Sequence, residues 1–287
     1  MRALVRAGLV AVLVAMGVAR ADSIKVVAAE NVYGDIVRQI GGANVTVTSI
    51  LTNPNQDPHE FEASASTARA IAEARLVIYN GAGYDTWAEK LLAASKSPSR
   101  EIIEVAKLVG KKAGDNPHLW YQPAAIDALA AAVAARLTKL DPGQGADYAR
   151  ALARFGEAME RLRRRITVLR AQFAGTAVTA TEPVFDYMAA ELGLNMRNGR
   201  FQLAVMNGTE PSAAAIAAFE DDLRTRAVKV LLYNSQTTQA LAKRMRTIAN
   251  QAGVPVVAVT ETLPPEQSYQ EWMLAQLDAL ERALGGR

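Results

Sequence analysis

The sequence predicts an α/β protein with two Rossmann-like lobes, each built on a parallel sheet, joined by one long spine helix. Short apolar strands alternate with helices in both halves of the chain, which is the pattern of βαβ units. Between the halves, apolar residues recur every three or four positions from 148 to 173, as they do on one face of a helix. With 287 residues the chain exceeds what one hydrophobic core usually serves, so two lobes are expected.

Residues 1–21 predict a secretory signal peptide. Arg2 and Arg6 stand at its start, an apolar run extends from Ala7 to Val18, and Ala19-Arg20-Ala21 matches a cleavage site. The apolar run is too short between its flanks for a good transmembrane helix. We therefore expect export, with no stable membrane insertion after the signal is removed.

Charge and cysteine content narrow the class of protein further. The predicted signal carries three arginines and no acid, so the formal charge of +3 falls to zero without it. Such a balance gives no reason to expect a nucleic-acid partner. The chain has no cysteine, and so neither a disulfide nor a lipid-accepting residue at the cleavage site. A freely diffusing periplasmic monomer is expected.

The first lobe is expected over residues 22–141. Strands are predicted at Ile24–Ala29, Val45–Leu51, Leu76–Tyr79 and Glu101–Val105, and helices at Tyr33–Ile40, Ser64–Ala74, Tyr84–Ala94 and about Pro123–Leu140. Ligands of open parallel sheets bind beyond the carboxyl ends of the strands. His59 follows the second predicted strand and is therefore expected at this edge.

A long helix is predicted over residues 142–174. Its apolar stripe consists of Tyr148, Leu152, Phe155, Met159, Leu162, Ile166, Leu169 and Phe173. At 1.5 Å per residue the helix spans roughly 40 Å, about the length of a domain. A coiled-coil dimerisation helix is the alternative, but a spine between lobes is favoured because another α/β half follows directly.

The second lobe is expected over residues 175–287. Strands are predicted at Ala177–Ala180, Val228–Tyr233 and Val254–Val259, with an extended stretch at Phe201–Val205, and helices at Val184–Leu192, Ala213–Arg224, Gln239–Ala252 and Tyr269–Leu284. The two halves echo each other, since residues 76–80 and 230–234 both end an apolar strand in Tyr-Asn.

The only two histidines occur in the same local context. His59 lies in Asp57-Pro58-His59 and His118 in Asn116-Pro117-His118. Proline fixes its own φ and biases the preceding residue to an extended conformation, so both imidazoles are presented rigidly. A single histidine is more often structural than a ligand. The repeated context favours a metal site.

Carboxylates must complete such a site from the second lobe, which has no histidine. Glu182 and Glu261 stand where predicted strands pass into loops. An isolated Glu there is usually a solvated charge or a helix-terminus partner. Two imidazoles and two carboxylates together suit Mn²⁺, Fe²⁺ or Zn²⁺. Asn234 and Gln236 either orient these carboxylates or cap the next helix, and capping is the favoured interpretation.

Four motifs together resemble the metal-binding periplasmic receptors of ABC transporters, the zinc/manganese solute-binding family. They are Asp-Pro-His-Glu-Phe-Glu (57–62), Asn-Gly-Ala-Gly-Tyr-Asp-Thr-Trp (80–87), Asn-Pro-His-Leu-Trp (116–120) and Val-Thr-Glu-Thr-Leu-Pro (259–264). The resemblance covers essentially the whole mature chain. It implies a non-enzymatic receptor that captures one divalent ion between its lobes and delivers it to a cognate membrane permease. It also implies that His59, His118 and Glu182 are ligands, with Glu261 replacing the usual Asp.

Two departures from the family pattern bear on the metal. Zinc-selective members often have a third His and a His-rich acidic loop, whereas this chain has Glu182 and a short connection at 106–116. This difference favours Mn²⁺ or Fe²⁺ as the bound ion. Relatives with the same Val-Thr-Glu-Thr motif are regarded as zinc receptors, however, so Zn²⁺ is also a candidate. Glu is longer than Asp by one methylene, so either Glu261 binds through one oxygen or water completes the site.

Two other functions fit parts of the pattern. Two His and a Glu also describe the catalytic zinc of a secreted hydrolase. The chain has neither a His-Glu-x-x-His nor a Gly-x-Ser-x-Gly motif, which disfavours that alternative. An adhesin-like interaction protein on the same fold is the other alternative, and sequence does not separate it from a receptor.

Overall fold

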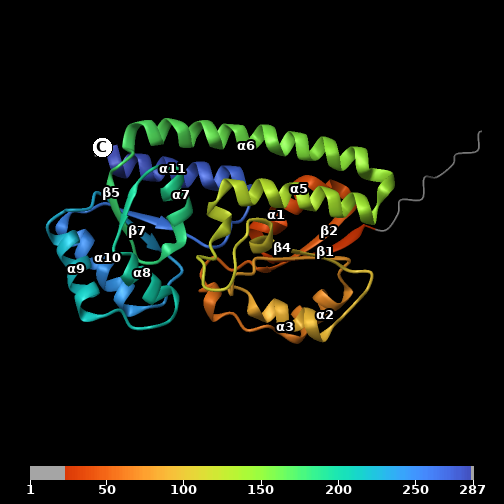
Figure 1. The fold of residues 1–287 in the computed structure, drawn as a ribbon, viewed down its shortest axis with the longest axis horizontal. Helices are drawn as coiled ribbons and strands as arrows, with labels where there is room; N and C mark the ends of the chain where they lie inside the picture. The colour runs from red at the N-terminus through yellow and green to blue at the C-terminus, as the bar shows by residue number, and fades with distance from the viewer. Residues whose placement is uncertain (1–22, 286–287) are drawn as a thin grey trace, which may run out of the picture.

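The computed structural model describes residues 23–285, so the signal peptide expected at 1–21 lies outside this range. Two α/β lobes lie next to each other, and helix α6 (Gly145–Phe173) runs along both of them (Figure 1). Among the described residues no helix is both long and apolar enough to cross a membrane.

The first lobe contains a four-stranded sheet in the order β2-β1-β3-β4, and every pair of neighbouring strands is parallel. The strands are β1 (Ile24–Glu30), β2 (Val45–Leu51), β3 (Leu76–Tyr79) and β4 (Glu101–Glu104). The helices are α1 (Asn31–Gly41), α2 (Ala65–Glu73), α3 (Thr86–Ala94), α4 (Val105–Leu108) and α5 (Pro123–Leu140). Figure 1 shows α1 and α5 on the α6 side of this sheet and α2 and α3 on the other. Such coverage explains why β3 is apolar and buried along its whole length.

The second lobe repeats this topology, with strand order β6-β5-β7-β8 and all pairs parallel. The strands are β5 (Ala177–Ala180), β6 (Asn195–Arg197), β7 (Leu231–Asn234) and β8 (Val256–Val259). The helices are α7 (Asp186–Glu191), α8 (Gly199–Met206), α9 (Ala213–Arg224), α10 (Ala240–Ala252) and α11 (Tyr269–Gly285). The two-lobed parallel α/β architecture predicted from the sequence is confirmed.

The apolar stripe of α6 packs inside the molecule. Six of its eight members are buried and the other two are partly buried and contact the same core: Tyr148, Phe155, Met159, Leu162, Ile166 and Leu169, then Leu152 and Phe173. On the adjoining faces Arg163 pairs with Asp127 of α5, and Arg165 pairs with Asp278 of α11. The stripe is therefore satisfied within one chain, as expected of a spine and not of a coiled-coil seam.

One predicted element is wrong. Residues Phe201–Val205 were expected to be extended, but they lie inside helix α8. Phe201 and Val205 are buried but Leu203 between them is 47% exposed, whereas a strand would place all three side chains on one face. A short apolar run does not distinguish the two, and the extended segment is instead β6, three residues long.

Asn80, which follows β3, anchors the segment that carries His118. Its Oδ1 accepts a 2.5 Å hydrogen bond from the Tyr33 hydroxyl, and its Nδ2 donates to the Pro117 carbonyl at 2.8 Å. The Asn80 side chain is fully buried, so these bonds do not compete with water. The backbone next to His118 is thus held against the core of the first lobe.

The lobes are linked by hydrogen bonds that surround residues 260–263. Asn31 donates to the Leu263 carbonyl at 2.7 Å and accepts from the Leu263 N–H at 2.9 Å. The Tyr121 hydroxyl donates to the Thr260 carbonyl at 2.8 Å. These first-lobe groups satisfy the backbone on both sides of Glu261, and so fix where that residue enters the space between the lobes.

Candidate metal centre

His59 lies in a short 3₁₀ turn, Pro58–Glu60, in the connection that follows β2. Asp57 Oδ1 accepts a 3.0 Å hydrogen bond from the His59 backbone N–H, and Pro58 occupies the first position of the turn. Both features restrain the backbone, as the sequence predicts. The imidazole is 28% exposed, which makes it the most accessible predicted ligand from the first lobe.

His118 precedes a second 3₁₀ turn, Leu119–Tyr121, and its side chain is fully buried. Asn116 Nδ2 donates to the Pro183 carbonyl at 2.7 Å, which leaves Asn116 Oδ1 as an acceptor. That oxygen lies 3.0 Å from the His118 backbone nitrogen and 2.7 Å from Nδ1. The neutral ring therefore carries its hydrogen on Nδ1 and directs the Nε2 lone pair away from Asn116.

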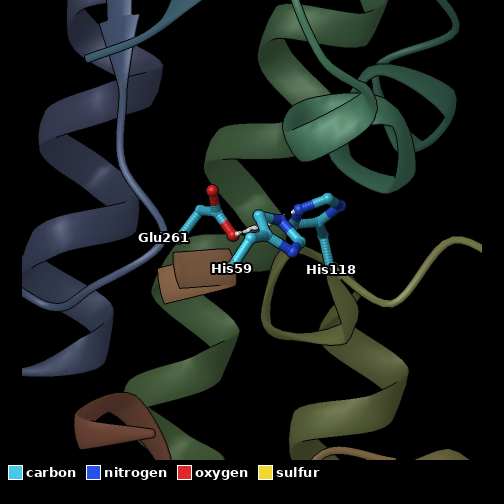
Figure 2. Close-up of side chains that lie close together, drawn as sticks. All are labelled: His59, His118 and Glu261. Carbon is cyan, nitrogen blue, oxygen red and sulfur yellow. Dashed lines mark ion pairs between the residues drawn. The ribbon is translucent and has the colours of Figure 1, made fainter. Parts of the chain in front are cut away.

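Glu261 follows β8 and brings its carboxylate from the second lobe to both histidines (Figure 2). Glu261 Oε2 lies 3.4 Å from His59 Nε2 and 3.3 Å from His118 Nε2. One ligand atom from each residue falls within 4.8 Å of the others. His118 Nε2 is buried without a hydrogen-bond partner, a costly arrangement for a polar atom unless it has a ligand.

Glu182 lies beside these three residues, at the start of a third 3₁₀ turn, Pro183–Phe185. It is 3% exposed, and it lines the same cavity of about 380 Å³ as His59. Its Oε2 accepts a 3.0 Å hydrogen bond from Asn234, while its Oε1 is buried without a partner. The structure thus brings all four predicted residues near one another, with Glu182 outside the group of three close ligand atoms.

Asn234 and Gln236 do not cap a helix, contrary to the favoured sequence interpretation. Helix α10 begins after Gln239, and no side chain caps its first turn. Asn234 Nδ2 instead contacts carboxylates of both Glu182 and Glu261, at 3.0 and 2.8 Å. Gln236 Oε1 accepts from the backbone N–H of Glu261 at 2.6 Å. Both amides therefore position the carboxylate side of the site.

Tyr84 is a site residue that sequence reasoning missed. Its hydroxyl donates a 2.8 Å hydrogen bond to Glu261 Oε2, and its ring meets the His59 ring edge to face at 5.0 Å. The residue lies within the 80–87 motif, which the sequence analysis used only for the family resemblance. A tyrosine in a polar motif is a weak signal, since most tyrosines there serve packing alone.

The charges of the site are strongly coupled. Burial alone would lower the pKa of His59, but the hydrogen bond and charge of Glu261 outweigh it and raise the pKa to about 9. Burial would raise the pKa of Glu261, but the adjacent imidazoles of His118 and His59 outweigh it and hold the pKa well below its usual value. Burial and then the charge of Glu261 raise the pKa of Glu182. The two carboxylates and the two imidazoles therefore influence one another's protonation.

Comparisons with known proteins agree with this architecture. The family model described as the periplasmic zinc-uptake complex component A (ZnuA) matches residues 26–283. The chain is 24% identical over 289 residues to the manganese ABC transporter substrate-binding lipoprotein PsaA of Streptococcus mitis, covering 93% of this chain and 91% of that protein.

Solved structures share the fold at low sequence identity. The periplasmic zinc-binding protein TroA from Treponema pallidum superimposes with a TM-score of 0.76 at 18% identity, covering 91% of this chain and 99% of TroA. A mutant of the laminin-binding adhesin (Lmb) from Streptococcus agalactiae gives a TM-score of 0.75 at 23% identity, covering 91% and 100%. These likenesses establish the two-lobed fold.

Proposed function

Because this chain belongs to the family of periplasmic zinc-uptake complex components A, we propose that it captures a divalent transition-metal ion and delivers it to the permease of an ABC transporter. Its relative PsaA is a substrate-binding lipoprotein of a manganese ABC transporter. The family is one of solute-binding proteins and not of enzymes, which favours this function over a zinc-dependent hydrolase. Likeness to an adhesin structure concerns the fold alone and supports no second function.

The ion is bound by His59, His118 and Glu261, and Glu182 completes the set. The observation that carries this assignment is the convergence of His59 Nε2, His118 Nε2 and Glu261 Oε2 in a largely buried space, where one nitrogen lacks any hydrogen-bond partner. Nitrogen and carboxylate oxygen ligands of this kind suit Zn²⁺ or Mn²⁺, and also Fe²⁺. The ion is cargo and is taken up and released intact.

Each part of the chain has a place in this function. Residues 1–21 direct export and are removed, and the protein then works as a monomer in the periplasm. Residues 22–141 supply the histidines, and residues 175–287 supply the carboxylates. Residues 142–174 join the two lobes, so that one ion contacts both.

Metal analysis of the purified mature protein tests this function. After chelation, the protein is equilibrated with equal Mn²⁺, Fe²⁺ and Zn²⁺ and its metal content is measured by mass spectrometry, next to His59→Ala and Glu261→Ala. We expect one ion per chain, lost in both variants. The absence of bound metal from the parent protein would refute the proposal. Retention in Glu261→Ala alone would indicate a three-ligand site and revive the hydrolase alternative.

A further inference from the structure

A single amide joins the two carboxylates of the site. Asn234 Nδ2 donates to Glu182 Oε2 at 3.0 Å and to Glu261 Oε1 at 2.8 Å. An amide NH₂ has two hydrogens, so each carboxylate takes one of them. Asn234 is 1% exposed, and its Oδ1 is occupied by the Gln236 backbone N–H at 3.1 Å. The orientation of the amide is therefore fixed, with its donors toward the carboxylates.

This arrangement leaves one oxygen of each carboxylate without a hydrogen bond from Asn234. For Glu182 the remaining oxygen is Oε1, which is buried and has no hydrogen-bond partner. For Glu261 it is Oε2, the oxygen nearest to both Nε2 atoms. The Tyr84 hydroxyl already donates to that oxygen at 2.8 Å, so part of its acceptor capacity is used.

We propose that Asn234 determines the metal preference of this protein, by holding one oxygen of each carboxylate so that Glu182 and Glu261 each offer the ion only one. This inference rests on the proposed function, since it assumes that the ion binds at this site. Two imidazole nitrogens and two single carboxylate oxygens make four protein ligands. Four ligands satisfy Zn²⁺, which is almost always tetrahedral in closed sites, whereas Mn²⁺ favours an octahedral set rich in oxygen.

The preference therefore arises from the hydrogen-bond partner and not from the ligand residues themselves. The four ligand side chains alone do not choose between the ions, because a carboxylate that binds through both oxygens adds a ligand without any change of residue. Asn234 acts as a positioning residue that prevents both carboxylates from binding the ion through two oxygens.

Asn234→Ser is the variant that tests the proposal. A serine hydroxyl still accepts from the Gln236 N–H and preserves the local turn, but it lacks the two-hydrogen donor that joins the carboxylates. Gln239→Ala is the matched control. It removes an amide that lines the same cavity as Glu182 and donates to the Val205 carbonyl at 3.1 Å, not to a carboxylate. Thermal unfolding of the metal-free proteins establishes that each variant folds.

Affinities for Zn²⁺ and Mn²⁺ are measured by competition with chelators, and the absorption spectrum of the Co²⁺-loaded protein reports coordination number. We expect the intense visible bands of four-coordinate Co²⁺ in the parent protein and in Gln239→Ala. In Asn234→Ser we expect weaker bands from a higher coordination number, with a ratio of Zn²⁺ to Mn²⁺ affinity lowered roughly tenfold or more.

The results separate failure of the proposed role of Asn234 from failure of the proposed receptor function. A parent protein that binds Co²⁺ with the weak spectrum of five or six ligands would overturn the role of Asn234 and leave the receptor function intact. Equal loss of affinity for Zn²⁺ and Mn²⁺ in Asn234→Ser, with the spectrum unchanged, would also overturn it. A parent protein that binds none of the three ions would refute the proposed function as well.

Discussion

The hydroxyl of Tyr84, from the first lobe, donates a 2.8 Å hydrogen bond to Oε2 of Glu261, from the second. The same oxygen is the nearest carboxylate atom to both histidines. Burial and then the charge of Glu261 raise the pKa of Tyr84 well above its usual value, so it remains a donor at every pH of interest. The bond therefore connects the lobes at a residue that we propose as a metal ligand.

Tyr84→Phe is expected to weaken metal binding roughly tenfold, because Glu261 loses the donor that orients its coordinating oxygen. The metal-free protein should also lose about 2 kcal/mol of unfolding free energy, as is typical of a hydrogen bond to a charged group. Titration calorimetry and denaturant unfolding measure the two effects. Tyr79→Phe is the control, since Tyr79 makes a similar 2.7 Å bond to Glu104 in the first lobe alone. Equal metal affinity in Tyr84→Phe and the parent would contradict the prediction.

Metal binding is expected to release about one proton per ion near pH 7.5, since the imidazole of His59 must lose its proton to coordinate. In the metal-free protein the pKa of this group is about 9, so it is mostly protonated at that pH. Apparent affinity should then rise about tenfold per pH unit and level off near pH 9. Calorimetry in buffers of different ionisation enthalpy counts the protons. An affinity that levels off near pH 7 would show that Glu261 does not raise the pKa of His59.

The metal-free protein should lose stability between about pH 6.5 and 9. The folded-state pKa of His59 lies above the unfolded value of about 6.5. The contribution of its charged form is therefore complete below 6.5 and lost as pH rises through 9. Glu261 stays ionised throughout, because its pKa is held low. The shift corresponds to about 3 kcal/mol. Denaturant unfolding at several pH values in this range measures the loss. In His59→Gln the unfolding free energy should not fall with pH in this way.

Leu162→Ala should destabilise the protein by about 3 kcal/mol, because Leu162 is fully buried on the inner face of α6. Val168→Ala, on the same helix but 47% exposed, should change stability by at most about 0.5 kcal/mol. Chemical denaturation compares the two. Metal affinity of the folded protein should be unchanged in both, and a selective loss in Leu162→Ala would mean that α6 also sets the geometry of the site.

Sequence reasoning predicted the fold because its strongest signals were local. The α6 stripe and the alternating strands and helices follow directly from periodicity. The error at Phe201–Val205 arose where a short apolar run fits either period. The candidate ligands were found because a proline precedes each histidine and because Glu182 and Glu261 stand where predicted strands pass into loops. Their roles as ligands remain predictions.

The positioning residues were harder to predict, because their roles depend on tertiary contacts. Asn234 and Gln236 were considered but assigned to a helix terminus. Whether an amide caps a helix or bridges two carboxylates depends on strands that are distant in sequence, as with Asn234 and Glu182. Tyr84 contacts Glu261 across 177 residues, a relationship that no local pattern contains.

Tyr-Asn pairs stand at the carboxyl ends of β3 and β7, with Asn80 just after β3 and Asn234 the last residue of β7. Each of these strands is the third along the chain in its half, in sheets of the same order. Asn80 donates to the backbone carbonyl of Pro117, beside His118, whereas Asn234 donates to the carboxylates of Glu182 and Glu261. If the halves descend from one duplicated ancestor, this position diverged into a scaffold role in one copy and a selectivity role in the other. Evolution of metal preference in such a chain is then free to act on the second asparagine without disturbing the first.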